Sequence, residues 1–277
     1  MAYIKTLYEN QPSSGAALLI PELQALYDGN LFFAPPMDRP FVYSNFVVTL
    51  DGVVSYNYHD FETGNTISDG DPEDHLIMGI LRSVADCIIW GSGSYKAARK
   101  FPSTPEAIWP KESLAFRKQR KTLGLAVHPT AVLVTASGHI PLDGALIADN
   151  EQNTIILTSE YGAEQLKSAH GGTQIIAITT GELLSAAAIR KTLWDMGFRS
   201  ILFEGGPTLF GDFLSEGVID EMFQTISPRL AGSSSDHHYL RLVENCAFRP
   251  ENSIKSELVS VKTNGAMLFT RYKVSTR

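Results

Sequence analysis

The chain has 277 residues, of which 44% are hydrophobic and 19% are charged, proportions typical of a soluble globular protein with a large core. Its net charge of −7 argues against general binding to nucleic acids or membrane surfaces, although not against small anionic ligands. No apolar run reaches the roughly 20 residues that span a bilayer, and no secretory signal is evident, so we expect a cytoplasmic protein.

The N-terminal segment differs in character from the rest of the chain. Residues 1–40 are expected to form an appended arm, with a helix around Glu22 to Tyr27 followed by a proline-containing stretch that cannot be helical. No linker or internal repeat divides the sequence beyond residue 40. Residues 41–277 are therefore expected to form one domain.

A strand and a helix open this domain. Residues 41–50 are rich in β-branched and aromatic side chains, which predicts a buried strand. Asp51 begins a turn into a shorter strand over Val53 to Tyr58. The stretch up to residue 68 is polar and irregular.

An acidic segment, Asp69 to His75, precedes the first long helix. We interpret it as a helix start: Asp71 caps, Pro72 occupies the first turn, and Glu73 and Asp74 favour the positive end of the helix dipole. Apolar residues then recur at helical spacing as far as Val84. No metal site is expected here.

The remainder alternates between strands and helices, which predicts a largely parallel sheet covered by helices. Strands are expected at 86–90, 130–135, 154–158, 174–178 and 200–203. Helices are expected near 112–123, 163–169, 182–196 and 208–215. Two β-rich runs, 254–262 and 267–274, flank a turn and predict a C-terminal antiparallel hairpin.

Two strand-to-helix junctions contain glycines, which let a ligand approach the backbone closely. One is Glu204-Gly205-Gly206-Pro207 and the other is Gly91-Ser92-Gly93-Ser94. Helix starts of this kind bind anions such as a pyrophosphate, so the pair is interpreted as two walls of one phosphate-rich site. Lys96 stands where the dinucleotide fingerprint needs a third glycine, so that fingerprint is absent. An ordinary glycine-containing turn is the alternative interpretation.

Four short segments occur in a characteristic order and spacing: Thr49-Leu50-Asp51-Gly52, Leu81-Arg82-Ser83, Gly91-Ser92-Gly93-Ser94 and Glu204-Gly205-Gly206-Pro207-Thr208-Leu209. In these segments the chain resembles the pyrimidine reductases of riboflavin biosynthesis, whose fold is dihydrofolate-reductase-like. The resemblance runs from Phe41 to the C-terminus.

The resemblance implies an NADPH-dependent reductase, similar to 5-amino-6-(5-phosphoribosylamino)uracil reductases, that reduces the open-chain imine of a phosphoribosylamino-pyrimidine. It also implies a homodimer. Arg82 is expected to pair with the substrate phosphate, and Glu204 to touch the substrate and orient or protonate the reacting amine, with Asp51 as the second candidate acid. Ser137 is expected near the adenosine 2′-phosphate. The remaining residues expected at the cofactor are Val48, Thr49, Gly91, Ser94, Gly205, Gly206, Pro207, Thr208 and Leu209.

Some features depart from the family pattern. Residues 97–102 replace its D-D-P segment, and Arg99 or Lys100 is the available substitute cation. Cys87 and Cys246 alone cannot build the zinc deaminase module of bifunctional relatives. A pterin or other heterocycle reductase, or a non-catalytic NADPH-binding protein, is the alternative function. The alternative roles are that Arg82 only forms a salt bridge to a helix neighbour and that Asp51 serves only the turn.

Overall fold

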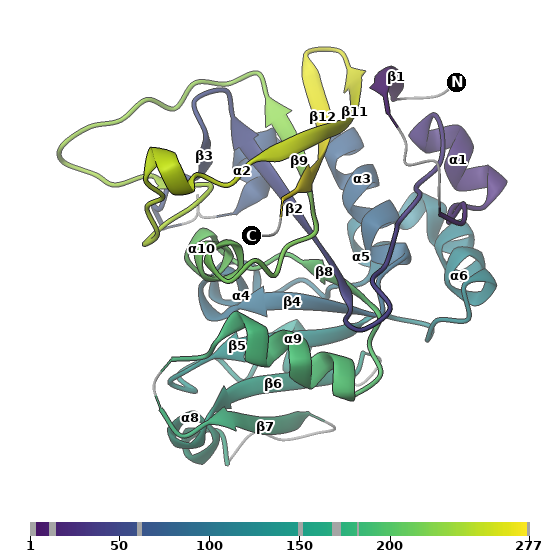
Figure 1. Ribbon diagram of the computed structural model, residues 1–277. Helices are drawn as coiled ribbons and strands as arrows, with labels where there is room; N and C mark the ends of the chain where they lie inside the picture. The colour runs from purple at the N-terminus through teal and green to yellow at the C-terminus, as the bar shows by residue number, and fades with distance from the viewer. Residues whose placement is uncertain are drawn as a thin grey trace.

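The computed structural model describes residues 4–10, 15–59, 63–148, 152–167, 173–181 and 183–275. A large twisted sheet carries helices on both faces (Figure 1). The strands are β1 (Lys5–Glu9), β2 (Phe41–Thr49), β3 (Val53–Ser55), β4 (Cys87–Gly91), β5 (Thr130–Thr135), β6 (Thr154–Ser159), β7 (Gln174–Thr179), β8 (Ser200–Phe203), β9 (Glu221–Ser227), β10 (Leu240–Arg241), β11 (Ser256–Asn264) and β12 (Met267–Val274). The helices are α1 (Pro21–Tyr27), α2 (Gly64–Ser68), α3 (Pro72–Ser83), α4 (Ser92–Ala98), α5 (Pro105–Ile108), α6 (Ser113–Thr122), α7 (Ala145–Ala148), α8 (Glu160–Gln165), α9 (Ala186–Asp195) and α10 (Pro207–Ser215), with short 3₁₀ turns at Pro110–Glu112 and Pro250–Asn252.

The large sheet has ten strands in the order β1-β11-β12-β9-β2-β8-β4-β5-β6-β7. The run from β9 to β7 is parallel throughout. At the other edge β12, β11 and β1 pair antiparallel. The predicted fold class, a mostly parallel sheet with a C-terminal antiparallel hairpin, is therefore confirmed. A small second sheet pairs β10 with β3.

Both faces of the parallel strands are apolar, as expected for strands covered by helices on each side. Successive residues alternate between two core clusters because side chains of a strand point to opposite faces. Ile88 and Trp90 of β4 pack with α3 and α6, whereas Cys87 and Ile89 pack with α9 and α10. The result is three layers with the sheet in the middle.

The first 40 residues contribute to one of these layers. Strand β1 pairs with β11 at the sheet edge, where the purple and yellow ends of the chain meet in Figure 1. Leu23 of α1 is fully buried, and the ring of Phe33 lies 4.6 Å from that of Phe41. The Gln119 side chain of α6 also accepts a hydrogen bond from Ile20 N at 2.8 Å. A domain boundary at residue 40 stays a prediction.

Several predicted elements differ in length from those observed. The strand expected over 53–58 ends at Ser55, since Asn57 adopts a positive φ of 54°. The stretch predicted as irregular contains α2. Helix α8 begins at Glu160 because the Ser159 hydroxyl caps it by accepting from Gly162 N. The predicted helix ends at residues 168–169, and the predicted start at 182, lie outside the described residues.

No helix in the described parts of the chain combines the length and apolar character needed to cross a membrane. The longest, α3, has 12 residues and is capped by Asp71, whose carboxylate accepts from Asp74 N at 2.9 Å. The predicted cap and the proline at the helix start are confirmed. The Asp71 cap and Pro72 therefore fix the residue at which α3 begins.

We predict that Leu23→Ala lowers the free energy of unfolding by about 2–5 kcal/mol, because the truncation leaves a cavity in the core. Urea denaturation followed by circular dichroism measures this change. Leu114→Ala is the matched control: Leu114 is 84% exposed on α6, so a change under about 0.5 kcal/mol is expected. Equal stabilities of wild type and Leu23→Ala would show that α1 does not pack on the domain in solution.

Candidate functional site

A cavity of about 1320 Å³ lies at the carboxyl ends of β2, β4 and β5 and beside the turn that follows β8. Ligands of open α/β sheets bind at this edge, because the loops that leave the strands converge there. Helices α2, α3, α4 and α10 complete its walls. Its volume exceeds the 300–1,000 Å³ or so of a usual single-ligand pocket, so it has room for a cofactor together with a substrate.

The two glycine-containing junctions meet in one wall of this cavity. Strands β4 and β8 are parallel neighbours, and Glu204 N donates to Ile89 O at 2.9 Å where they end. A Cβ on Gly91 would lie 3.5 Å from Gly206 N, an ordinary contact distance, so the two turns are close neighbours. A Cβ on Gly205 would clash with the Phe203 ring at 2.6 Å, so this position needs a residue without a side chain.

Helix α10 starts at this wall without a side-chain cap. Its N-cap is Gly206, and Pro207 follows in the first turn. By contrast, α9 begins with Ser185, whose hydroxyl accepts from Ala188 N. Residues Gly205 to Leu209 and residues Gly91 to Ser94 all line the cavity. A nine-residue helix with free amides at its positive end suits a pyrophosphate, so these residues fit a dinucleotide cofactor.

Arg82 and Glu204 form a buried ion pair in the cavity. The guanidinium donates from Nε to both carboxylate oxygens at 3.1 Å and from Nη2 to Oε2 at 2.8 Å. The two side chains are only 5% and 6% exposed. The pair joins α3 to the turn after β8, and in it Glu204 is a carboxylate that accepts hydrogen bonds. The alternative of a salt bridge to a helix neighbour is wrong, because the partner of Arg82 lies 122 residues away on another element.

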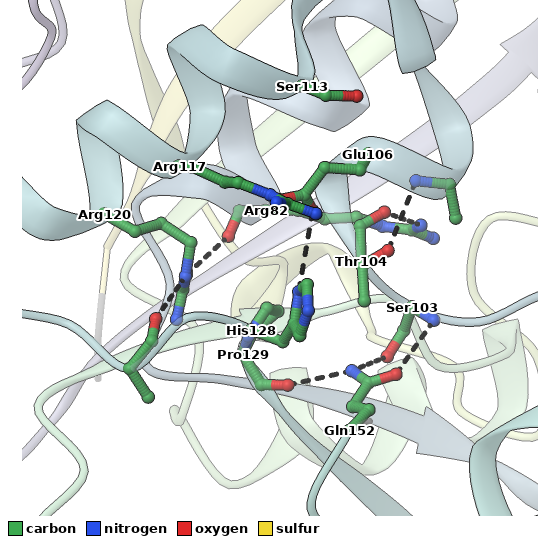
Figure 2. A network of polar contacts seen from close by, with 12 residues as sticks. Arg82, Ser103, Thr104, Glu106, Ser113, Arg117, Arg120, His128, Pro129 and Gln152 are labelled. Carbon is green, nitrogen blue, oxygen red and sulfur yellow. Dashed lines mark hydrogen bonds and ion pairs between the residues drawn. The ribbon is translucent and has the colours of Figure 1, made fainter. Parts of the chain in front are cut away.

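A network of polar contacts around Thr104 and Arg120 fixes the position of Arg82 (Figure 2). Its Nη1 donates to Thr104 O at 3.3 Å, and Arg120 of α6 donates to the carbonyl of Arg82 at 3.1 Å. Arg120 also donates to Ala85 O at 2.7 Å. Burial lowers the pKa of Arg120 to about 10, so it stays charged at neutral pH and satisfies the carbonyls at the end of α3. Little freedom remains for the Arg82 side chain.

A second buried acid, Asp74, lines the same cavity from the start of α3. It is 3% exposed, and burial raises its pKa to about 6, against the opposing effect of the Thr225 and Ser68 hydroxyls. The sequence pattern assigns Asp74 only to the helix dipole. The sequence did contain a sign of this position: Asp74, Met78 and Arg82 are spaced four residues apart. Residues at that spacing share one face of a helix, so Asp74 could have been expected to face the same site as Arg82.

The remaining ionisable residues of the lining are His75, Lys96, Asp212 and Glu216. Among the described lining residues, the groups able to carry positive charge are His75, Arg82 and Lys96. Burial lowers the pKa of His75. Arg99 and Lys100, the candidate substitute cations, do not line the cavity, and Arg99 lies 3.7 Å from Asp143 instead.

Four residues expected at the site are not in the cavity lining: Val48, Thr49, Asp51 and Ser137. Val48 and Thr49 are buried in β2, and Ser137 is exposed in the turn after β5, where its hydroxyl accepts from His139 N at 3.3 Å. Contact of these four residues with a ligand therefore stays a prediction.

Asp51 instead ties two loops together. Its carboxylate accepts from the Thr49 hydroxyl at 2.6 Å, from Ala231 N at 3.1 Å and from Gly232 N at 2.6 Å. These hydrogen bonds, that of Thr49 foremost, lower the pKa of Asp51 to about 2. A carboxyl with that pKa holds no proton at neutral pH, so the geometry supports the turn role of Asp51 and not a role as acid.

The fold and the cavity together define a dihydrofolate-reductase-like protein with a dinucleotide-sized site at the carboxyl edge of its sheet. The chain belongs to the RibD C-terminal domain family, which matches residues 40–266. The resemblance stated from the sequence is thereby confirmed.

Relatives and solved structures agree with this assignment. The chain is 26% identical over 184 residues to a 2,5-diamino-6-ribosylamino-4(3H)-pyrimidinone 5′-phosphate reductase of Archaeoglobus fulgidus, covering 66% of this chain and 78% of that protein. It is 22% identical over 241 residues to a protein of the same description from Aquifex aeolicus, covering 86% and 98%. A pyrimidine reductase-like protein from Corynebacterium diphtheriae has the same fold, with a TM-score of 0.69, 20% identity and coverage of 93% and 100%.

We predict that Asp74→Asn stabilises the protein at pH 8 but not at pH 4. The folded-state pKa of Asp74 is about 6, above its ordinary 3.8, so ionising it in the fold costs stability above pH 6 and nothing below 3.8. The shift corresponds to at most about 3 kcal/mol at pH 8. Urea denaturation of both proteins at the two pH values measures it. A gain of the same size at pH 4 would contradict the titration as its cause.

Proposed function

We propose that the chain is an NADPH-dependent reductase that reduces the open-chain imine of a phosphoribosylamino-pyrimidine in riboflavin biosynthesis. The observation that carries this proposal is the buried Arg82–Glu204 pair beside an uncapped, glycine-bounded helix start in one cavity. The relatives described above are named as reductases of such a pyrimidine, which supports the same reaction class.

The cofactor contacts follow from the two junctions. Amides at the start of α10, around Thr208 and Leu209, are proposed to hold the pyrophosphate, with Gly91 and Ser94 beside them in the same wall. When bound, the nicotinamide supplies a hydride. The glycines of the two turns carry no side chains that would block the approach of the cofactor. Preference for NADPH over NADH is part of the proposal.

Glu204 is proposed to lie against the nitrogen of the imine. An imine accepts hydride readily once its nitrogen carries a proton, and that proton brings positive charge. A carboxylate fixed by Arg82 orients the protonated nitrogen and stabilises its charge without having to reorganise. The proposal gives Asp51 no part in this step, because its carboxylate accepts hydrogen bonds from the loop amides of Ala231 and Gly232.

A substrate phosphate needs a cation that is free to meet it. Arg82 directs its Nε and Nη2 to Glu204 within the protein. Lys96 lines the cavity from α4 and is exposed, so it is the better-placed residue for the phosphate. Arg82 then attracts the phosphate mainly through its positive charge at a distance, and not through direct hydrogen bonds.

The first test offers the purified protein NADPH with the 2-amino and the 2-oxo forms of the phosphoribosylamino-pyrimidine, and with dihydrofolate as a separate substrate. Loss of absorbance at the NADPH band with a pyrimidine alone supports the proposal. Oxidation with dihydrofolate alone points to a pterin reductase, and tight NADPH binding without oxidation points to a non-catalytic binder. Light scattering of the same sample measures whether the protein forms the homodimer that the family resemblance implies.

We predict that Glu204→Gln lowers kcat by at least about 100-fold, because the neutral amide cannot stabilise a protonated imine. The Kd for NADPH is expected to change less than about threefold, since the proposed cofactor contacts are backbone amides. Steady-state kinetics and fluorescence titration measure the two quantities. Glu164→Gln, which removes an exposed carboxylate from α8, is the control for net charge. Unchanged turnover in Glu204→Gln would remove Glu204 from the chemistry.

A further inference from the structure

Helix α3 presents two charged side chains to the cavity, two helical turns apart. Asp74 lies at its start and Arg82 near its end, and Met78 lines the cavity between them. At 1.5 Å per residue their backbones are about 12 Å apart along the helix axis. Arg82 is paired with Glu204 at the end assigned to the reacting imine. Asp74 is a buried acid that this mechanism does not use.

The two candidate substrates of the proposed reaction have pyrimidine rings that differ at position 2. A carboxylate in the site can distinguish them by their hydrogen-bond donors. A 2-amino-4(3H)-pyrimidinone carries hydrogen on N3 and on its 2-amino group, so this edge offers two neighbouring donors. A uracil offers one donor at N3 between two carbonyl acceptors. An ionised carboxylate can only accept hydrogen bonds. It therefore forms two hydrogen bonds with the edge of the 2-aminopyrimidinone, whereas the uracil would place a carbonyl acceptor against one of its oxygens.

We propose that Asp74 binds the N3–H and 2-amino edge of the pyrimidine, and that the chain therefore acts on the 2-aminopyrimidinone and discriminates against the uracil. This rests on the proposed function and assigns Asp74 as the residue that sets its ring specificity. The sugar-bearing C6 lies across the ring from N3. A ring held at Asp74 thus directs its ribosylamino tail along α3 toward Arg82 and Glu204.

The surroundings of Asp74 suit this role. The neighbouring acids are Asp71, the N-cap residue of the same helix, and Glu204 after β8, and both raise the pKa of Asp74. His75 and Arg82 are the basic groups of the helix, while α2 and β9 contribute the neutral hydroxyls of Ser68 and Thr225. With a pKa of about 6, Asp74 is ionised at neutral pH, where it accepts both hydrogen bonds of the 2-amino edge.

The test compares kcat/KM for the 2-amino and 2-oxo phosphoribosylamino-pyrimidines in wild type and Asp74→Asn at pH 7.5. Wild type is expected to prefer the 2-amino substrate at least tenfold. An asparagine amide offers one donor and one acceptor, which matches the uracil edge, so the ratio is expected to fall at least tenfold in the variant. Glu73→Gln removes the adjacent carboxylate, which does not line the cavity, and is expected to leave the ratio unchanged.

A binding measurement separates this inference from the proposed function. Calorimetric titration with 2,6-diaminopyrimidin-4-one and with 6-aminouracil requires no turnover. Preferential binding of the first compound, lost in Asp74→Asn, supports the inference even if neither nucleotide is reduced. Turnover of both nucleotides with equal kcat/KM, and the same ratio in the variant, would overturn it while leaving the reductase intact.

The pH dependence provides a second readout. Protonated Asp74 offers one donor and one acceptor, so the preference of wild type for the 2-amino ring is expected to fade as the pH falls below about 6. The Asp74→Asn ratio is expected to stay constant over the same range. Asp74→Ser, which has a smaller side chain that also offers one donor and acceptor capacity, repeats the test should the asparagine variant fold poorly. A wild-type ratio that is constant from pH 5 to 8 would contradict the role of the carboxylate.

Discussion

The buried ion pair between Arg82 and Glu204 is the interaction on which the geometry of the site depends. It joins the end of α3 to the turn after β8, two segments that are remote in sequence. Both charges are almost fully removed from water, so losing either would leave the other buried and unpaired, a change that typically costs about 3–5 kcal/mol. Hydrogen bonds with Thr104 and Arg120 hold Arg82 in place, and Arg82 in turn holds the Glu204 carboxylate. The carboxylate is therefore fixed before any ligand binds.

Two acids are buried in the lining of this cavity, where ionisation costs more than it does in water. Asp74 and Glu204 both lie in the cavity lining with little exposure to solvent. Burial raises the pKa of Asp74, which means that the folded protein is less stable with that group ionised. Acids kept at such a cost are frequent at functional sites, where they recognise or stabilise part of a ligand.

Support for α3 comes from parts of the chain far from the cavity. The N-terminal segment packs Leu23 and Phe33 into the same core cluster as the apolar side of the helix. At the antiparallel edge, Arg271 donates to Glu221 at 2.6 Å and to Phe32 O at 2.7 Å, which fastens this segment to β12 and β9. The position of α3, and with it the spacing of Asp74 and Arg82, is therefore set by the whole sheet and not by the cavity walls alone.

Local patterns in the sequence were enough to predict the strand at β2, the capped start of α3 at Asp71 and Pro72, and the glycine turn at Gly205, because each depends on residues adjacent in the chain. The fold class followed from their order. Only the tertiary structure paired Arg82 with Glu204, put Asp74 in the cavity and left Asp51 outside its lining. Burial, ion pairing and the resulting pKa depend on distances between segments far apart in sequence, which no local pattern encodes.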